Sequence, residues 1–193
     1  MKANRFFMTA IFSIIGVLAA AQPWMMRPQG PANEFSAIEG TSVLSYNFQR
    51  DRDIHSRAGY GPAFYIFPDS KLDNNQALEL AGKLDLVNII KEYGGRIIVV
   101  NPSSDKWQEQ DLENFRRLIG MGGSPTNVKV IGIGSGATFV NRHLAATDMT
   151  GVIAGIVSID GEPGKICKLP VPAFIGGKNA AKAAKPYQTT SDS

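Results

Sequence analysis

The residues with the clearest potential for chemistry lie in a glycine-rich turn, Gly132-Ile133-Gly134-Ser135-Gly136-Ala137. Residues 128–133, which lead into the turn, are mainly apolar and β-branched, whereas residues 135–146 have helical spacing. A direct strand-to-helix turn requires residues without bulky side chains, and it points backbone N–H groups at whatever lies above the helix start. The pattern therefore predicts a reacting or binding centre here, or a turn that serves packing alone.

One hypothesis for this turn is a nucleophile elbow, in which Gly-x-Ser-x-Gly presents a serine at the top of a sheet. With Gly132 and Gly136 as the outer glycines, the nucleophile position is Gly134, which has no side chain to react. Shifting the pattern by one residue makes Ser135 the candidate nucleophile, although the large Ile133 then stands where close packing favours a small residue. Gly134 and Gly136 are the candidate ligand-binding positions in either frame.

A serine nucleophile also needs a base and a group that orients the base. His143 lies two turns into the predicted helix, roughly 12 Å from its start at 1.5 Å per residue. Asp160 follows the predicted strand 152–158 and is the best candidate acid, because ligands bind at the carboxyl ends of parallel strands. Its alternative role is to form a turn with Gly161.

A second hypothesis is a dinucleotide fingerprint. Gly132-x-Gly134-x-x-Ala137 fits the glycine pattern, and Asp160 would be the acid that binds the ribose. Such a fingerprint normally opens a sheet, whereas several predicted strands and helices precede this one. We therefore expect no cofactor.

Two further groups of residues have metal or thiol chemistry in principle. Asp51, Asp53 and His55 alternate in a polar loop, so an extended segment would turn all three to one side, as a metal site requires. Isolated loops of this kind are usually only solvated, and we expect no metal. The single cysteine, Cys167, makes no internal disulfide and is expected to be a small, buried or half-buried side chain.

The elements that position these residues follow from hydrophobic periodicity. The predicted strands cover residues 41–49, 63–67, 96–100, 128–133, 152–158 and 171–175, and the predicted helices cover residues 75–93, 105–119 and 135–146. The first part of the tail after Lys178 is also compatible with a helix. Apolar strands alternating with helices indicate a three-layer α/β/α sandwich with a mainly parallel sheet.

Residues 122–136, with strand 152–158 and residues 170–177, resemble secreted esterases of the poly(3-hydroxybutyrate) depolymerase and feruloyl esterase type, within the α/β-hydrolase superfamily. The resemblance covers about residues 62–187 and implies a minimal α/β-hydrolase-like fold. It places an acid shortly after Gly177, where residues 178–182 contain no carboxylate, and a histidine later still, although none follows His143. Its His-Gly oxyanion segment is replaced by Pro68-Asp69-Ser70, where Ser70 is a candidate ligand contact.

The first 21 residues have the features of a secretory signal. Lys2 and Arg5 precede an apolar run from Phe6 to Ala20, and small residues at Ala19–Ala21 suit cleavage. We expect a secreted protein with no stable membrane insertion after cleavage, consisting of a linker or arm (22–40), an α/β-hydrolase-like domain (41–187) and a frayed tail (188–193). The net charge of +3 is spread out, which argues against a nucleic-acid partner.

Taken together, these features predict an exported protein of esterase or depolymerase ancestry that lacks the standard triad. It would bind a small ester, a glycan or a polymer. The alternatives are an active serine ester hydrolase that uses Ser135 with Asp160 and a base from elsewhere, and the dinucleotide-binding protein.

Overall fold

The computed structural model describes residues 33–38, 41–48, 62–121 and 127–188. Its strands are β1 (Glu34–Ala37), β2 (Val43–Asn47), β3 (Ala63–Phe67), β4 (Arg96–Val100), β5 (Val128–Ile133), β6 (Ile153–Ile159) and β7 (Ala173–Gly176). Its helices are α2 (Asn74–Lys83), α3 (Leu86–Tyr93), α4 (Gln110–Met121), α5 (Ser135–Phe139), the π-helix η2 (Val140–Leu144) and α6 (Ala180–Gln188). The predicted signal, the polar loop 51–61 and all but the first residue of the predicted tail 188–193 lie outside the described residues.

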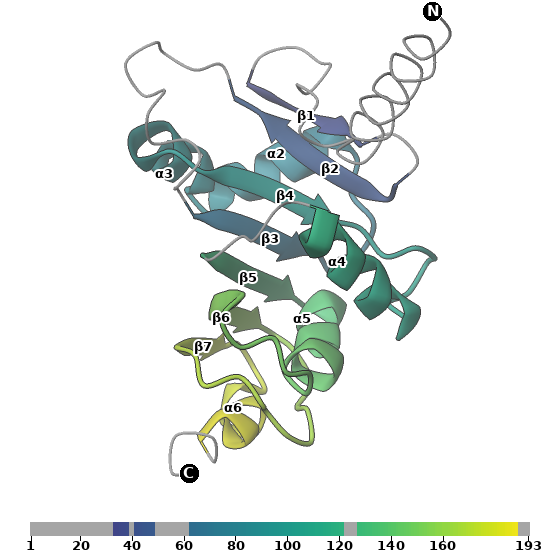
Figure 1. The fold of residues 1–193 in the computed structure, drawn as a ribbon, viewed down its shortest axis with the longest axis vertical. Coiled ribbons are helices and arrows are strands. Elements are labelled where there is room, and N and C mark those ends of the chain that lie inside the picture. Colours follow the sequence, from purple (N-terminus) through teal and green to yellow (C-terminus); the bar gives the residue numbers. More distant parts are fainter. Residues whose placement is uncertain (1–32, 39–40, 49–61, 122–126, 189–193) are drawn as a thin grey trace, which may run out of the picture.

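The strands form one sheet in the order β1-β2-β4-β3-β5-β6-β7. The five strands β4, β3, β5, β6 and β7 pair in parallel with their neighbours. Strands β1 and β2 are antiparallel and lie at one edge of the sheet. Helices α4 and α5 cover one face, and α2 and α3 cover the other (Figure 1). The predicted three-layer α/β/α fold with a mainly parallel sheet is thus confirmed.

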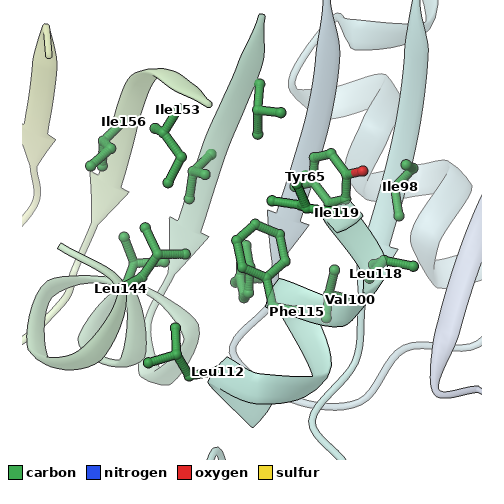
Figure 2. Close-up of a cluster of buried hydrophobic side chains, with 14 of the residues drawn as sticks. Tyr65, Ile98, Val100, Leu112, Phe115, Leu118, Ile119, Leu144, Ile153 and Ile156 are labelled. Carbon is green, nitrogen blue, oxygen red and sulfur yellow. The ribbon is translucent and has the colours of Figure 1, made fainter. Parts of the chain in front are cut away.

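The core beneath α4 and α5 is built on aromatic side chains. Phe115 of α4 packs edge-on against Tyr65 and Phe67 of β3, with ring centroids 5.4 and 5.1 Å apart. Figure 2 shows Phe115 among the aliphatic side chains of the neighbouring strands and helices. Because β3 lies in the middle of the sheet, this packing fixes the strand whose end faces the glycine turn.

Two helix predictions require correction. The predicted helix 75–93 is two helices, because Asp85 adopts a left-handed conformation with φ of 56° that no α-helix can continue through. The predicted helix 105–119 begins only at Gln110, because the buried carboxylate of Asp111 accepts hydrogen bonds from the backbone N–H groups of Ser103 and Gln108. That carboxylate folds the preceding residues into a loop.

The sequence analysis also missed a strand and a change of helix type. Residues 34–37, within the predicted linker or arm, pair antiparallel with β2 as the edge strand β1. The helix after the glycine turn widens from α to π at Val140, where the backbone N–H of Ala145 donates to the carbonyl of Val140. Short π-segments occur often at functional sites.

We predict that Tyr65→Phe stabilises the protein, most strongly at alkaline pH. The Tyr65 hydroxyl is buried and has no hydrogen-bond partner among the described residues, so its removal is expected to be neutral or favourable by up to about 1 kcal/mol near pH 7. Burial raises the pKa of Tyr65 from 10.0 to about 12, although the charge of Arg96 opposes this. The folded protein therefore holds the Tyr65 proton more tightly than the unfolded chain does. The contribution of this difference to stability is complete below pH 10 and is lost as the pH rises to about 12, so the wild type becomes less stable over that range whereas Tyr65→Phe does not.

Urea denaturation of both proteins at pH 7 and at pH 11.5 measures this effect. The advantage of Tyr65→Phe is expected to grow with pH toward about 3 kcal/mol, at 1.36 kcal/mol for each pKa unit. An equal difference at both pH values would mean that the hydroxyl is hydrated or bonded in the folded protein.

Candidate functional site

The glycine turn joins β5 to α5 at the carboxyl edge of the sheet. Gly134 has φ of 57° and ψ of −118°, a conformation suited to glycine, and Ser135 is the first residue of the helix. The backbone N–H of Gly134 donates to the carbonyl of Ile159 at 2.8 Å, which fixes the turn against the end of β6. The strained residue between strand and helix, where an elbow carries its nucleophile, is therefore Gly134.

The two outer glycines are required for close packing. A Cβ atom on Gly132 would lie 2.6 Å from the Cα atom of Ala137, so only glycine lets the helix start this close to the strand. A Cβ atom on Gly136 would lie 2.5 Å from both the carbonyl carbon of Phe67 and the carbonyl oxygen of Pro68, just past the end of β3, and Gly136 is buried. These contacts account for both glycines, and ligand binding at Gly136 remains a prediction.

The space above Gly134 is filled by Asp69, which the sequence analysis did not select as a site residue. The backbone N–H of Ser135 donates to Asp69 Oδ1 at 2.6 Å, and the Ser135 hydroxyl donates to the backbone carbonyl of Asp69. A Cβ atom on Gly134 would lie 2.6 Å from Asp69 Cγ. The carboxylate therefore occupies the place in which the side chain of a nucleophile would begin.

The loop that carries Asp69 is held by hydrogen bonds from two other segments of the chain. The indole N–H of Trp107 donates to the carbonyl of Pro68 at 3.0 Å. The buried amide of Asn101 accepts from the backbone N–H of Leu72 at 3.0 Å and donates to its carbonyl at 2.9 Å. These contacts from the end of β4 and from the loop before α4 position Asp69 over the turn. The signal for Asp69 in the sequence was its place two residues after the end of β3, in the segment 68–70 at the carboxyl edge of the sheet.

Asp160 makes a similar contact two strands away. It follows β6, has φ of 57°, and its Oδ1 accepts from the backbone N–H of Lys178 at 2.9 Å. Its own backbone N–H donates to the carbonyl of Gly176 at 3.0 Å. A Cβ atom on Gly177 would lie 2.7 Å from Asp160 Cγ, so here too a carboxylate lies on a glycine of positive φ. Asp160 thus closes the turn after β7, and its predicted catalytic role stays a prediction.

The structure does not bring the other predicted groups to Ser135. The ring of His143, on η2, stacks on Phe139 with centroids 5.4 Å apart, and the Ser135 hydroxyl donates to a backbone carbonyl. Ser70 is exposed beside Asp69, and ligand contact there is untested. Asp51, Asp53 and His55 lie outside the described residues. Within the described ranges no three His, Cys, Asp or Glu side chains cluster as a metal site would require.

Comparison with known proteins gives structural similarity only. No protein-family model and no curated protein sequence matches the chain. Solved structures that it resembles include a carboxylesterase from the ammonia-oxidizing thaumarchaeon Nitrososphaera gargenis (19% identity, TM-score 0.40) and a Staphylococcus aureus protein assigned as an esterase (15% identity, TM-score 0.43). A third is the acylaminoacyl peptidase of Pyrococcus horikoshii (14% identity, TM-score 0.35).

These similarities cover 68%, 72% and 66% of this chain. The chain spans 47% and 45% of the first two structures and 22% of the peptidase. The fold class therefore rests on the strand order and the helix layers of this chain itself.

The sheet also has an apolar surface away from its carboxyl edge. On the face that α2 and α3 cover, Phe174 of β7 is 64% exposed and lines a shallow groove of about 440 Å³ with Phe64, Lys129 and Val157. The Lys129 ammonium lies along the sheet and donates to the carbonyl of Ala154 at 3.1 Å. Among the described residues, none of the helices is both long and apolar enough to cross a bilayer.

Proposed function

We propose that this chain is an exported, non-catalytic binding protein with an α/β-hydrolase-like fold and esterase or depolymerase ancestry. The observation that carries the proposal is Gly134: the strained position of the strand-turn-helix motif has no side chain that could attack a carbonyl carbon. The strained turn with its close-packed glycines supports the ancestry, as does the resemblance of residues 62–187. The proposed ligand is a small ester, a glycan or a polymer bound at the carboxyl edge.

The position of Asp69 also supports a non-catalytic role. An oxyanion hole needs backbone N–H groups that point to the place where negative charge develops. Here the N–H of Ser135 is already bonded to the Asp69 carboxylate at 2.6 Å. A second anion at that point would be repelled, so this edge is unsuited to stabilising a tetrahedral intermediate.

The competing function is a serine hydrolase that uses Ser135. It requires a base that takes the Ser135 proton, and in the described residues that hydroxyl donates to the Asp69 carbonyl instead. It also requires Asp160 to orient that base through its remaining carboxylate capacity, since Oδ1 already accepts from the N–H of Lys178.

A fluorophosphonate probe separates these functions because it labels serines that a nearby base has activated. We expect no labelling of the wild type or of Ser135→Ala, beside an active serine esterase as the positive control. Labelling of the wild type that disappears in Ser135→Ala would establish a hydrolase and overturn the proposal. A rise in melting temperature with nicotinamide dinucleotide, abolished in Asp160→Ala, would instead establish the dinucleotide-binding alternative.

The proposal of export has its own test. Expression of the full chain with its natural N-terminus, followed by sequencing of the released protein, is expected to give a product that begins at Gln22. A cell-retained product that still begins with Met1 would contradict export without affecting the proposal of a non-catalytic turn.

A further inference from the structure

A basic groove lies between the loop after β6 and helix α6. It has a volume of about 450 Å³ and is lined by Pro163, Gly164, Lys165, Lys182, Lys185 and Pro186. Three of these six residues are lysines, and none is acidic. The groove shares no residue with the carboxyl edge around Gly134, so an inference from it is independent of whether Ser135 is reactive.

None of the three lysines forms a salt bridge within the described part of the chain, and the neighbouring Glu162 carboxylate accepts from the side-chain amide of Asn179 at 2.9 Å. The salt bridges there join Lys83 to Glu79 and Arg116 to Glu113, and all three groove lysines are exposed. Lys182 and Lys185 are three residues apart on α6, which places their Cβ atoms on one side of the helix about 5–6 Å apart. Lys165 comes from the opposite wall. Three lysines and no acidic residue therefore line one groove.

Both walls of this groove are fixed by one buried side chain, Asn141 of η2, which is only 1% exposed. Its Nδ2 donates to the carbonyl of Glu162 at 2.8 Å, and its Oδ1 accepts from the hydroxyl of Tyr187 at 2.9 Å. A Cβ atom on Gly164 would lie 2.9 Å from the backbone carbonyl carbon of Asn141, so the loop lies directly against η2. Burial raises the pKa of the Tyr187 hydroxyl, which keeps it protonated as a donor.

This scaffold keeps the two backbone segments that carry the three lysines close to each other. The lysine side chains are exposed, but the walls that bear them are tied at a set separation by Asn141. Mutual repulsion of like charges is unfavourable, and a bound anion relieves it. The arrangement is thus pre-organised for a negatively charged ligand.

We propose that this groove binds a soluble polyphosphate-type ligand, one with several phosphate groups in a row. The charge of the groove favours it: one carboxylate would leave two of the three ammonium groups uncompensated, whereas adjacent phosphates supply several negative charges in a short length. Lysine binds phosphate as a point charge without the planar geometry that arginine requires, which suits a flexible ligand in a shallow groove.

Titration of the full-length protein with sodium tripolyphosphate by isothermal calorimetry tests the proposal. We expect measurable binding at low salt, weakened by 0.5 M salt, and at least about tenfold weaker binding in the double variant Lys182→Glu/Lys185→Glu, since two attractive charges become repulsive. The matched control is Lys91→Glu/Lys106→Glu, which changes the net charge equally at two exposed lysines away from the groove. The control is expected to bind within about twofold of the wild type.

Equal weakening in both double variants would mean that binding follows net charge alone, and that result overturns the proposal, as does an absence of binding. Two further ligands test the chemical class. Poly-glutamate that binds as tightly as tripolyphosphate would overturn the preference for phosphate. Vesicles with an anionic phospholipid that bind through Lys182 and Lys185, and that free tripolyphosphate does not displace, would assign the groove to a membrane surface instead. Melting curves show that each variant is folded.

Discussion

Gly134→Ala is expected to lower the free energy of unfolding by about 2–6 kcal/mol, because two unfavourable effects add at this position. Alanine at φ of 57° and ψ of −118° carries backbone strain of about 1–3 kcal/mol. Its Cβ atom would also lie 2.6 Å from Asp69 Cγ, and overpacking of this kind costs a further 1–3 kcal/mol or so. Urea denaturation of purified variants measures the change.

The same experiment separates strain from the contact with Asp69 by a double-mutant cycle. Asp69→Gly removes the clash and the bond to the Ser135 N–H, so alone it is expected to cost about 1–3 kcal/mol. The double variant Asp69→Gly/Gly134→Ala should be more stable than the sum of the single effects predicts, by about 1–3 kcal/mol. Strict additivity would show that Asp69 does not occupy the space above Gly134.

Gly82→Ala is the matched control for the glycine substitution. Gly82 lies in α2, and a Cβ atom there would meet nothing within 4 Å. Alanine favours a helix by about 1 kcal/mol over glycine, so this variant is expected to be slightly more stable than the wild type. The contrast between the two glycines tests whether the turn after β5 has the strained conformation of an elbow.

Asn141→Ala is expected to lower the free energy of unfolding by about 3 kcal/mol. The substitution removes the bond to the Glu162 carbonyl and the bond from the Tyr187 hydroxyl, at 2.8 and 2.9 Å. Leaving the partner of a buried hydrogen bond unpaired costs about 1–3 kcal/mol, so the loss of two such bonds gives a total near the low end of about 2–6 kcal/mol, since neither partner residue is fully buried. Because these bonds join the loop after β6 and α6 to η2, the C-terminal part of the fold should loosen.

Thermal melting and amide hydrogen exchange of Asn141→Ala measure the two effects, with Tyr187→Phe as the control. That control removes one of the two bonds and is expected to cost about 1 kcal/mol. Faster exchange in α6 is expected for Asn141→Ala. If Asn141→Ala costs no more than Tyr187→Phe, the bond to Glu162 contributes nothing and the groove walls are not fixed by this side chain.

Local sequence by itself determined the elements and the class of fold. The apolar runs 63–67, 96–100 and 128–133 became central parallel strands, because continuous β-branched and aromatic residues suit a sheet that is buried on both faces. The glycines of the turn could also be predicted from the sequence, because close approach of strand and helix excludes a Cβ atom at Gly132. Periodicity did not find the break at Asp85, because the hydrophobic spacing continues across a residue whose left-handed conformation ends the helix.

Only the tertiary structure decided the candidate site. The sequence left open whether Gly134 or Ser135 is the strained residue of the turn, and the positive φ of Gly134 shows that it is Gly134. Asp69 lies 66 residues from Ser135 in the chain, and Tyr187 lies 46 residues from Asn141. Contacts over such separations depend on strand order, here on β3 beside β5 and on α6 folding back toward η2. No local pattern encodes them, because they arise only when parallel crossovers bring distant strand ends to one edge of the sheet.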